Sequence, residues 1–174
     1  MMLSKSFGVN HLKLEKGLYL SQVDRLDDTT TLTFDIRIRK PYVDPILTDV
    51  EVHTLEHCLA TGVREYISES NKTGILPIYI GPMGCATGFY VVLQFSDQLY
   101  KEKDYYPVVS EILTGAIAKI FEMDEIPAKD KKQCGNANTL GNTDMAYSLA
   151  KELEKIVEKT KVSNAFDEYP MLKE

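Results

Sequence analysis

The chain has 174 residues, of which 44% are hydrophobic and 26% charged, a balance typical of one soluble globular domain. Its formal net charge is -6 and acidic and basic residues are interspersed, so no basic stripe could neutralise a nucleic-acid backbone. The first residues lack the apolar stretch of a signal peptide, and no apolar run approaches the ~20 residues that span a bilayer. We therefore expect a cytoplasmic protein that binds neither nucleic acid nor membrane.

Cysteine and histidine are scarce, with three residues of each. The odd number of cysteines, without a short repeated spacing, argues against a disulfide framework and leaves metal binding, catalysis or burial. The sequence contains no internal repeat, low-complexity tract or long linker, so all segments are expected to share one core. This predicts a single domain over residues 1–174.

Alternating side chains predict four strands. From residue 31 to 40, apolar residues alternate with polar ones, which predicts a half-buried strand. The preceding segment GLYLSQVDRL (17–26) is predicted to pair with it through the polar turn at 27–29. Residues 75–80 and 89–95 predict two further strands, separated by the glycine- and proline-rich turn GPMGCATG.

Helical spacing predicts three helices. Thr48 and Glu51 have the spacing of a capping box, which opens a helix that runs to about Ser70. Amphipathic periodicity predicts two more helices, roughly over 106–123 and 143–159, with a Gly/Asn-rich loop between them. Together these elements predict an α+β fold in which an antiparallel sheet packs against helices.

The motif HTLEH places His53 and His57 four residues apart on the first predicted helix. Residues at this spacing share a face, so both imidazoles can reach one ion at the edge of the apolar stripe. Glu56 lies on the adjoining face, where its carboxylate can act on whatever the ion binds. The alternative is two surface histidines that share a face by chance, and the H-x-x-E-H order also occurs in inverzincin metallopeptidases. The motif indicates metal chemistry without naming a reaction.

The three cysteines differ in their surroundings. Cys85 lies in the glycine-rich turn, where it is either a small residue that fills the turn or an exposed thiol activated by Arg37. Cys134 follows two lysines in the later loop, and a thiolate is a good third ligand for a site that already holds two imidazoles. Three protein ligands would leave a position open for substrate. Cys58 points about 100° away from His57, and we predict a packed thiol without a role in the chemistry.

Several short segments occur in a specific order along the chain. They are SF at 6–7, His11, FDIR at 34–37, HTLEH at 53–57, PMGCATGFY at 82–90 and KQCG at 132–135. Each is modest evidence alone, but the ordered set, over about residues 4 to 159, resembles the S-ribosylhomocysteine lyase family, LuxS. The resemblance implies that His53, His57 and Cys134 hold one divalent ion per subunit, natively Fe(II), for which zinc or cobalt can substitute. It further implies that Cys85 and Glu56 are an acid/base pair.

The resemblance also implies a substrate and an assembly. Ser6, His11 and Arg37 would contact S-ribosylhomocysteine, and the active site would form between two subunits of a homodimer. The implied reaction moves the sugar carbonyl from aldose to ketose and then eliminates homocysteine. The other product would be 4,5-dihydroxy-2,3-pentanedione, the precursor of autoinducer-2.

The chain departs from the family pattern near the glycine-rich turn. Many members have an aspartate and a serine before PMGC, where this chain has Tyr79 and Gly81, and Ala86 replaces a frequent Arg or Gln. Residues from about 160 form a divergent tail. These departures leave open a catalytically silent metal-binding relative. An inverzincin-like metallopeptidase is a further alternative, although Cys134 and the short chain fit it less well.

Overall fold

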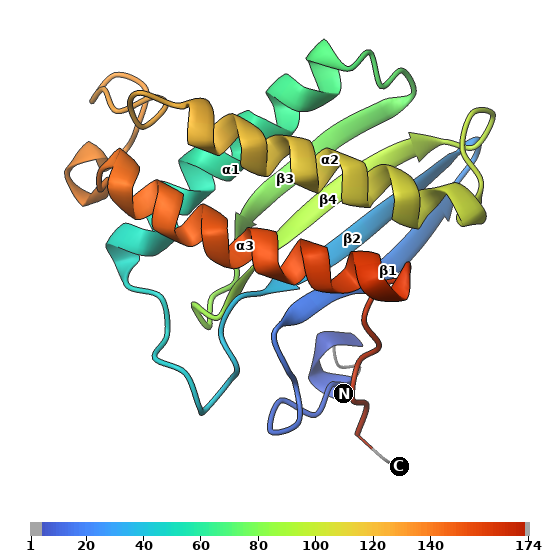
Figure 1. The fold of residues 1–174 in the computed structure, drawn as a ribbon. Helices are drawn as coiled ribbons and strands as arrows, with labels where there is room; N and C mark the ends of the chain where they lie inside the picture. Colours follow the sequence, from blue (N-terminus) through green and yellow to red (C-terminus); the bar gives the residue numbers. More distant parts are fainter. Residues whose placement is uncertain (1–4, 173–174) are drawn as a thin grey trace.

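The computed structural model describes residues 5–172, which form four β-strands and three α-helices (Figure 1). Residues 1–4 and 173–174 of the expected domain lie outside the described residues. The elements in chain order are β1 (Gly17–Leu26), β2 (Thr29–Arg37), α1 (Asp49–Glu69), β3 (Ile75–Pro82), β4 (Gly88–Ser96), α2 (Glu102–Glu122) and α3 (Thr143–Ser163). Short 3-10 helices occur at Lys5–Gly8 and Ala137–Thr139. Within residues 5–172, no helix combines the length and apolarity needed to cross a bilayer.

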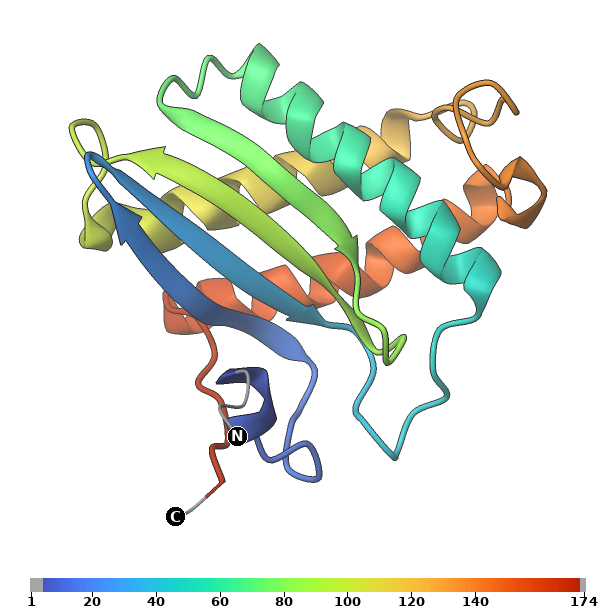
Figure 2. The same cartoon turned by 180° about the vertical axis from the view of Figure 1, so that it is seen from behind.

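The four strands form one antiparallel sheet in the order β1-β2-β4-β3. In the central pair, Leu32 lies opposite Leu93 and Phe34 opposite Val91, so the apolar residues of both strands point to one face. All three α-helices cover that face, and none of the three covers the other (Figures 1 and 2). The predicted α+β fold, with an antiparallel sheet packed against helices, is confirmed.

Local sequence signals determine where helix α1 begins and where helix α3 ends. Thr48 caps α1 as predicted, because its hydroxyl accepts from the backbone N–H of Glu51 while the Glu51 carboxylate accepts from that of Thr48. The predicted end of the last helix at about residue 159 is too early. Helix α3 continues to Ser163, where Asn164 ends it in the left-handed conformation, with φ of 52°. The segment that was predicted as a tail from about residue 160 is therefore helical up to Ser163.

Helix α2 begins earlier than predicted. Amphipathic periodicity predicts a start at about Tyr106, directly before Pro107. The structure starts the helix at Glu102, where the carboxylate of Asp104 accepts the backbone N–H of Lys101 at 2.8 Å. This N-terminal hydrogen bond holds an additional turn before the proline.

Strand β2 also differs from its prediction. It ends at Arg37 rather than near residue 40, because the N–H groups of Ile38 and Arg39 both donate to the Thr87 carbonyl instead of continuing the ladder. The strand was expected to be half buried, with a solvated polar face. Asp35 and Arg37, which lie on that face, are only 1% and 3% exposed. The segments near both chain ends cover this part of the sheet.

Helices α1 and α2 approach closely at Gly62. A methyl group at this position would lie 2.6 Å from the backbone carbonyl oxygen of Ala116, which cannot rotate away. We expect Gly62→Ala to lower the free energy of unfolding by about 1–3 kcal/mol, although alanine is the better helix former. Urea unfolding followed by circular dichroism measures this change. Glu65→Ala, at an exposed position of α1, is the control and should shift it by less than about 0.5 kcal/mol; an equally small shift for Gly62→Ala would contradict the close approach.

Candidate metal centre and active-site pocket

His53 and His57 lie one turn apart on α1, and Cys134 reaches them from the loop between α2 and α3. The Sγ of Cys134 lies 3.4 Å from Nε2 of His53, and the two imidazole centroids are 4.7 Å apart. One ligand atom from each residue can be chosen so that all three lie within 4.8 Å of one another. Such a triangle suits a tetrahedral ion with bonds of about 2.0–2.3 Å and an open fourth position. The structure therefore brings together the three residues of the predicted metal set.

Both imidazoles are oriented through their second ring nitrogen. Nδ1 of His57 lies 2.7 Å from the carbonyl oxygen of Pro127, which can only accept, so Nδ1 carries the proton. Nδ1 of His53 lies 2.7 Å from the hydroxyl of Thr139, whose own proton goes to the carbonyl of Asn136. Nδ1 of His53 must therefore donate as well. In both neutral rings this leaves Nε2 unprotonated, as a metal ligand requires.

The loop that carries Cys134 is fixed to α1 and to itself. The backbone N–H of Gly141 donates to the Thr54 hydroxyl on α1 at 2.8 Å, and the N–H of Cys134 donates to the Asp130 carbonyl at 2.9 Å. The Cys134 side chain is consequently buried, with 8% of its surface exposed. The donor set, its burial and the ring orientations fit a bound metal ion.

A second group of predicted residues lines a cavity of about 220 Å³ beside the end of the sheet, on β2, the turn after β3 and the segment before β1. The predicted residues in this group are Ser6, His11, Arg37 and Cys85. The cavity is also lined by Asp35, Tyr90 and Tyr169, which the sequence did not single out. The structure thus gathers the expected substrate contacts and the expected acid/base thiol into one pocket, which we call the Cys85 pocket.

Cys85 is the accessible thiol of the chain. Nη1 of Arg37 donates to the Thr87 hydroxyl at 2.5 Å and lies 3.6 Å from Sγ of Cys85. Because the Thr87 oxygen accepts from Arg37, its proton can go to Sγ, 3.0 Å away. Burial by itself would raise the pKa of Cys85, but the hydrogen bonds from Thr87 and the charge of Arg37 outweigh it, so the net pKa lies below that of a free thiol. This environment favours the thiolate.

The conformation of the turn at residues 83–87 determines where the Cys85 thiol points. Ala86 has a left-handed backbone with φ of 53°, which is strained for a residue with a side chain. The backbone N–H of Leu47 donates to the Ala86 carbonyl at 2.9 Å and holds the turn in place. Cys58, by contrast, is fully buried in the core, where desolvation raises its pKa to about 12. The predicted packing of Cys58 is confirmed.

The two groups of site residues remain separate within one chain. Within residues 5–172, Arg37 and Cys85 contact Asp35 and Thr87, whereas Cys134 faces His53 and the two imidazoles face each other. Glu56 lies between the two histidines in the sequence of α1, and its side chain is partly exposed. The structure therefore places His53, His57 and Cys134 in one cluster, with Glu56 on the same helix as the histidines, and Cys85 with the expected substrate contacts in another.

The departures before the glycine-rich turn are coupled. A Cβ on Gly81 would lie only 2.0 Å from the hydroxyl oxygen of Tyr79, so the tyrosine side chain occupies the space over the glycine. Any side chain at position 81 would have to displace Tyr79. Tyr79 and Gly81 therefore depend on each other, because the tyrosine side chain fits only where position 81 has no side chain.

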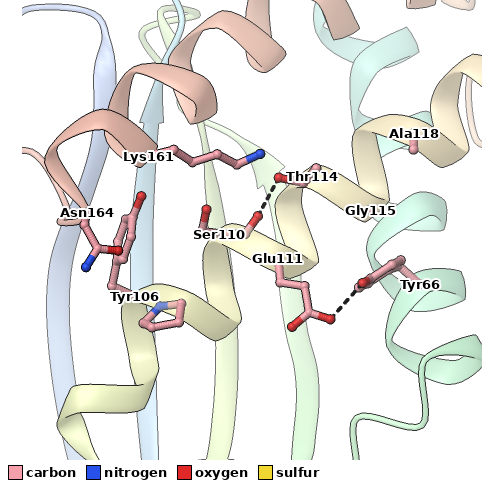
Figure 3. A pocket seen from close by; sticks show the side chains of 10 residues that line it. Tyr66, Tyr106, Ser110, Glu111, Thr114, Gly115, Ala118, Lys161 and Asn164 are labelled. Carbon is pink, nitrogen blue, oxygen red and sulfur yellow. Dashed lines mark hydrogen bonds between the residues drawn. The ribbon is translucent and has the colours of Figure 1, made fainter.

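A further cavity lies elsewhere, on the outer side of the helix layer (Figure 3). It measures about 440 Å³ and is lined by residues of α1, α2 and α3. Its acidic group, Glu111, already accepts from Tyr66 at 2.9 Å and from Lys72 at 2.6 Å. Neither a thiol nor an imidazole is among the residues that line it. This cavity therefore contains none of the predicted site residues.

The fold and the site define an α+β protein with a His-His-Cys cluster that could hold a metal ion and a separate pocket around a thiol of lowered pKa. The family model for S-ribosylhomocysteinase (LuxS) matches residues 4–164. The chain belongs to the LuxS family, as its motifs indicated, and this match favours the lyase over the metallopeptidase alternative.

Similar proteins named S-ribosylhomocysteine lyase occur in several bacteria. That of Clostridium beijerinckii is 41% identical over 83% of this chain and 84% of its own length. That of Clostridium acetobutylicum is 40% identical over 75% and 77%, and that of Borreliella burgdorferi (strain ZS7) is 38% identical over 86% and 88%.

Proposed function

We propose that this chain is an S-ribosylhomocysteine lyase, a carbon–sulfur lyase that forms homocysteine and 4,5-dihydroxy-2,3-pentanedione, the autoinducer-2 precursor of quorum sensing. The observation that carries this function is the cluster of His53, His57 and Cys134, with both Nε2 atoms directed to ligation, in a chain of the LuxS family. The related proteins named above bear the same activity in their names.

His53, His57 and Cys134 are proposed to hold one divalent ion, Fe(II) in the cell, with zinc or cobalt as substitutes. Neutral imidazole and thiolate are suitable ligands for these ions. A bound ion would act as a Lewis acid that polarises the sugar carbonyl and makes the protons on the adjacent carbon more acidic. The fixed Nδ1 hydrogen bonds keep both rings ready for this ligation.

The reaction requires protons to move along the sugar chain. The carbonyl shifts from C1 to C2 and then to C3, and each shift removes a proton from one carbon and returns a proton to its neighbour. Loss of the proton beside the C3 carbonyl then forms a carbon–carbon double bond and expels homocysteine from the next carbon. We assign these transfers to the Cys85 thiolate and the Glu56 carboxylate, each worth about 10²–10⁴-fold in rate. Arg37 and Thr87 would keep the Cys85 sulfur ionised.

Ser6, His11 and Arg37 are proposed to bind the substrate, since they line the same cavity as Cys85. The sugar carries hydroxyl groups along its whole chain, and the polar atoms of these residues suit hydroxyl recognition. The cavity of about 220 Å³ is large enough for a small sugar portion but leaves little space for bulk water.

A homodimer is proposed to bring the two groups of site residues together. The helix-free face of the sheet carries apolar side chains with much of their surface exposed, including Leu76 at 56% and Tyr79 at 49%. A second copy packed on this face would cover them. It would also allow the metal ligands of one subunit to face the Cys85 pocket of the other.

We further propose that residues 1–174 act as one LuxS-like domain and that it works in the cytoplasm. All three cysteines are free in the structure. A reducing compartment such as the cytoplasm keeps a metal-binding thiol and a catalytic thiol from oxidising.

Release of free thiol from S-ribosylhomocysteine tests the function. Anaerobically purified, metal-loaded protein should release one homocysteine thiol per substrate, detected with a colorimetric thiol reagent. Absence of thiol release from a protein with one bound ion per chain would support the catalytically silent alternative instead.

Subunit complementation tests the shared site. Cys85→Ala and His57→Ala homodimers should each be nearly inactive, but mixed dimers should regain activity, since one of their two sites has both an intact metal set and an intact thiol. Analytical ultracentrifugation provides the dimer mass. Mixed dimers without activity would place the whole site within one chain.

A further inference from the structure

The segment after α3 runs back along the beginning of the chain (Figure 1). Its residues 165–172, here called the C-terminal strap, lie beyond residue 164, where the match to the family model ends. The strap forms two isolated bridges, from Asp167 to Tyr19 and from Met171 to Val9. Additional backbone hydrogen bonds join Asp167 to Leu18 and residues 170 and 172 to residues 10 and 8. The strap is therefore an ordered part of the fold.

Tyr169 points from the middle of the strap into the Cys85 pocket, which it helps to line. Its ring stacks on that of Tyr19, with centroids 4.6 Å apart and planes within 5° of parallel. Its hydroxyl donates to Oδ2 of Asp35 at 2.8 Å. A residue outside the matched family region thus contacts a buried carboxylate at the wall of the pocket.

The contact between Tyr169 and Asp35 is connected to the Cys85 thiol through Arg37. The same Oδ2 of Asp35 accepts from Nη2 of Arg37 at 2.6 Å, and Nη1 of Arg37 faces Cys85 and Thr87. Tyr169 therefore acts on the carboxylate that orients the guanidinium beside the thiol. The remaining atoms of the pair, Oδ1 of Asp35 and Nε of Arg37, are buried and have no hydrogen-bond partner within residues 5–172. Few contacts therefore fix the orientation of the Arg37 guanidinium. One of them, from Tyr169 to Asp35, holds the carboxylate with which Arg37 pairs.

We propose that Tyr169 of the C-terminal strap is a positioning residue for Cys85, acting through Asp35 and Arg37. This inference rests on the proposed role of Cys85 as a proton-transfer group. With the hydroxyl present, Asp35 is held by two donors on one oxygen, and Arg37 keeps Nη1 directed at the sulfur. Without it, the carboxylate can rotate and pair its second oxygen with the unpartnered Nε of Arg37 in a bidentate contact. The guanidinium would turn with it and move Nη1 away from Cys85.

The charges around Tyr169, Asp35 and Arg37 indicate in which direction loss of the Tyr169 hydroxyl should change the pKa of Cys85. Burial raises the pKa of Asp35, and the charge of Arg37 and hydrogen bonds from Arg37 and Tyr169 oppose that rise, with a smaller contribution from His11. Tyr19 and Tyr90 are the other titratable side chains near the pair, and burial raises the pKa of both phenols, so both stay neutral. The cation that favours the Cys85 thiolate is therefore Arg37, and its displacement should raise the pKa of the thiol.

Alkylation of Cys85 by iodoacetamide tests this directly in full-length, metal-loaded protein. In Tyr169→Phe, which keeps the ring stack, the pH midpoint of alkylation should rise and the rate at pH 7 should fall by about threefold to tenfold. Mass spectrometry of the modified peptide assigns the reaction to Cys85. Glu168→Gln, at the exposed neighbouring position, is the control and should match the unmodified chain. A midpoint in Tyr169→Phe that is unchanged or lower would overturn the proposal.

Turnover gives an independent measurement. Tyr169→Phe should lower kcat/KM for thiol release by about tenfold and shift the acid limb of its pH profile upward, as the alkylation midpoint does. A purely structural role of the strap would lower the activity without moving the limb, which would also count against the proposal. If the unmodified chain releases no thiol, the proposed lyase function is wrong, while the alkylation experiment still decides whether Tyr169 positions Arg37 beside Cys85.

Discussion

Replacing Cys85 by alanine should slow thiol release by about 10²–10⁴-fold while one metal ion per chain is retained. The sulfur is the atom that Arg37 and Thr87 surround, and alanine at this exposed position removes it without opening a cavity in the core. The proposed metal ligands should be unaffected, since His53, His57 and Cys134 are not among the residues that line the Cys85 pocket. Anaerobic metal analysis and the colorimetric thiol assay on the same preparation measure both quantities.

The matched control is Cys58→Ala. Cys58 lies next to His57 in sequence but is buried in the core, so its replacement should cost some stability and leave turnover nearly unchanged. Full activity of Cys85→Ala would remove Cys85 from the mechanism. Loss of the metal from Cys85→Ala would instead place this thiol among the ligands.

Local patterns explain why so much of the site could be predicted from the sequence. The spacing of His53 and His57 becomes one face of a helix as soon as the helix is recognised, and the capping box at Thr48 fixes where that helix begins. The alternation in β2 likewise fixes which side chains face the helices. Such features depend on residues a few positions apart, which the sequence displays directly.

The supporting contacts could not be predicted, because they join distant segments. Thr139 and Pro127 orient the histidines from the segment between α2 and α3, and the carbonyl of Pro127 has no residue-type signal at all. Asp35 looked like a solvated residue of an alternating strand, but Tyr169, far along the chain, covers it. Only the tertiary fold shows that the strap belongs to the pocket.

Replacing His57 by alanine should abolish stoichiometric metal binding and, with it, thiol release. The change leaves one imidazole and one thiolate, and two ligands cannot close the site that three ligand atoms within 4.8 Å define. Alanine is the best helix former, so α1 should persist and the loss should be specific to the site. Elemental analysis of anaerobically purified protein, in parallel with circular dichroism, separates loss of metal from loss of helix.

Two comparisons make this result specific. Glu65→Ala, on an exposed position of the same helix, should keep one ion per chain and full turnover. Cys134→Ala should behave like His57→Ala although it lies in a different element, because Sγ of Cys134 lies 3.4 Å from Nε2 of His53 and closes the same triangle. An ion retained by His57→Ala with the affinity of the unmodified chain would mean that the α1 face does not hold the metal, and the proposed Lewis-acid chemistry would then have no ligands in this part of the chain.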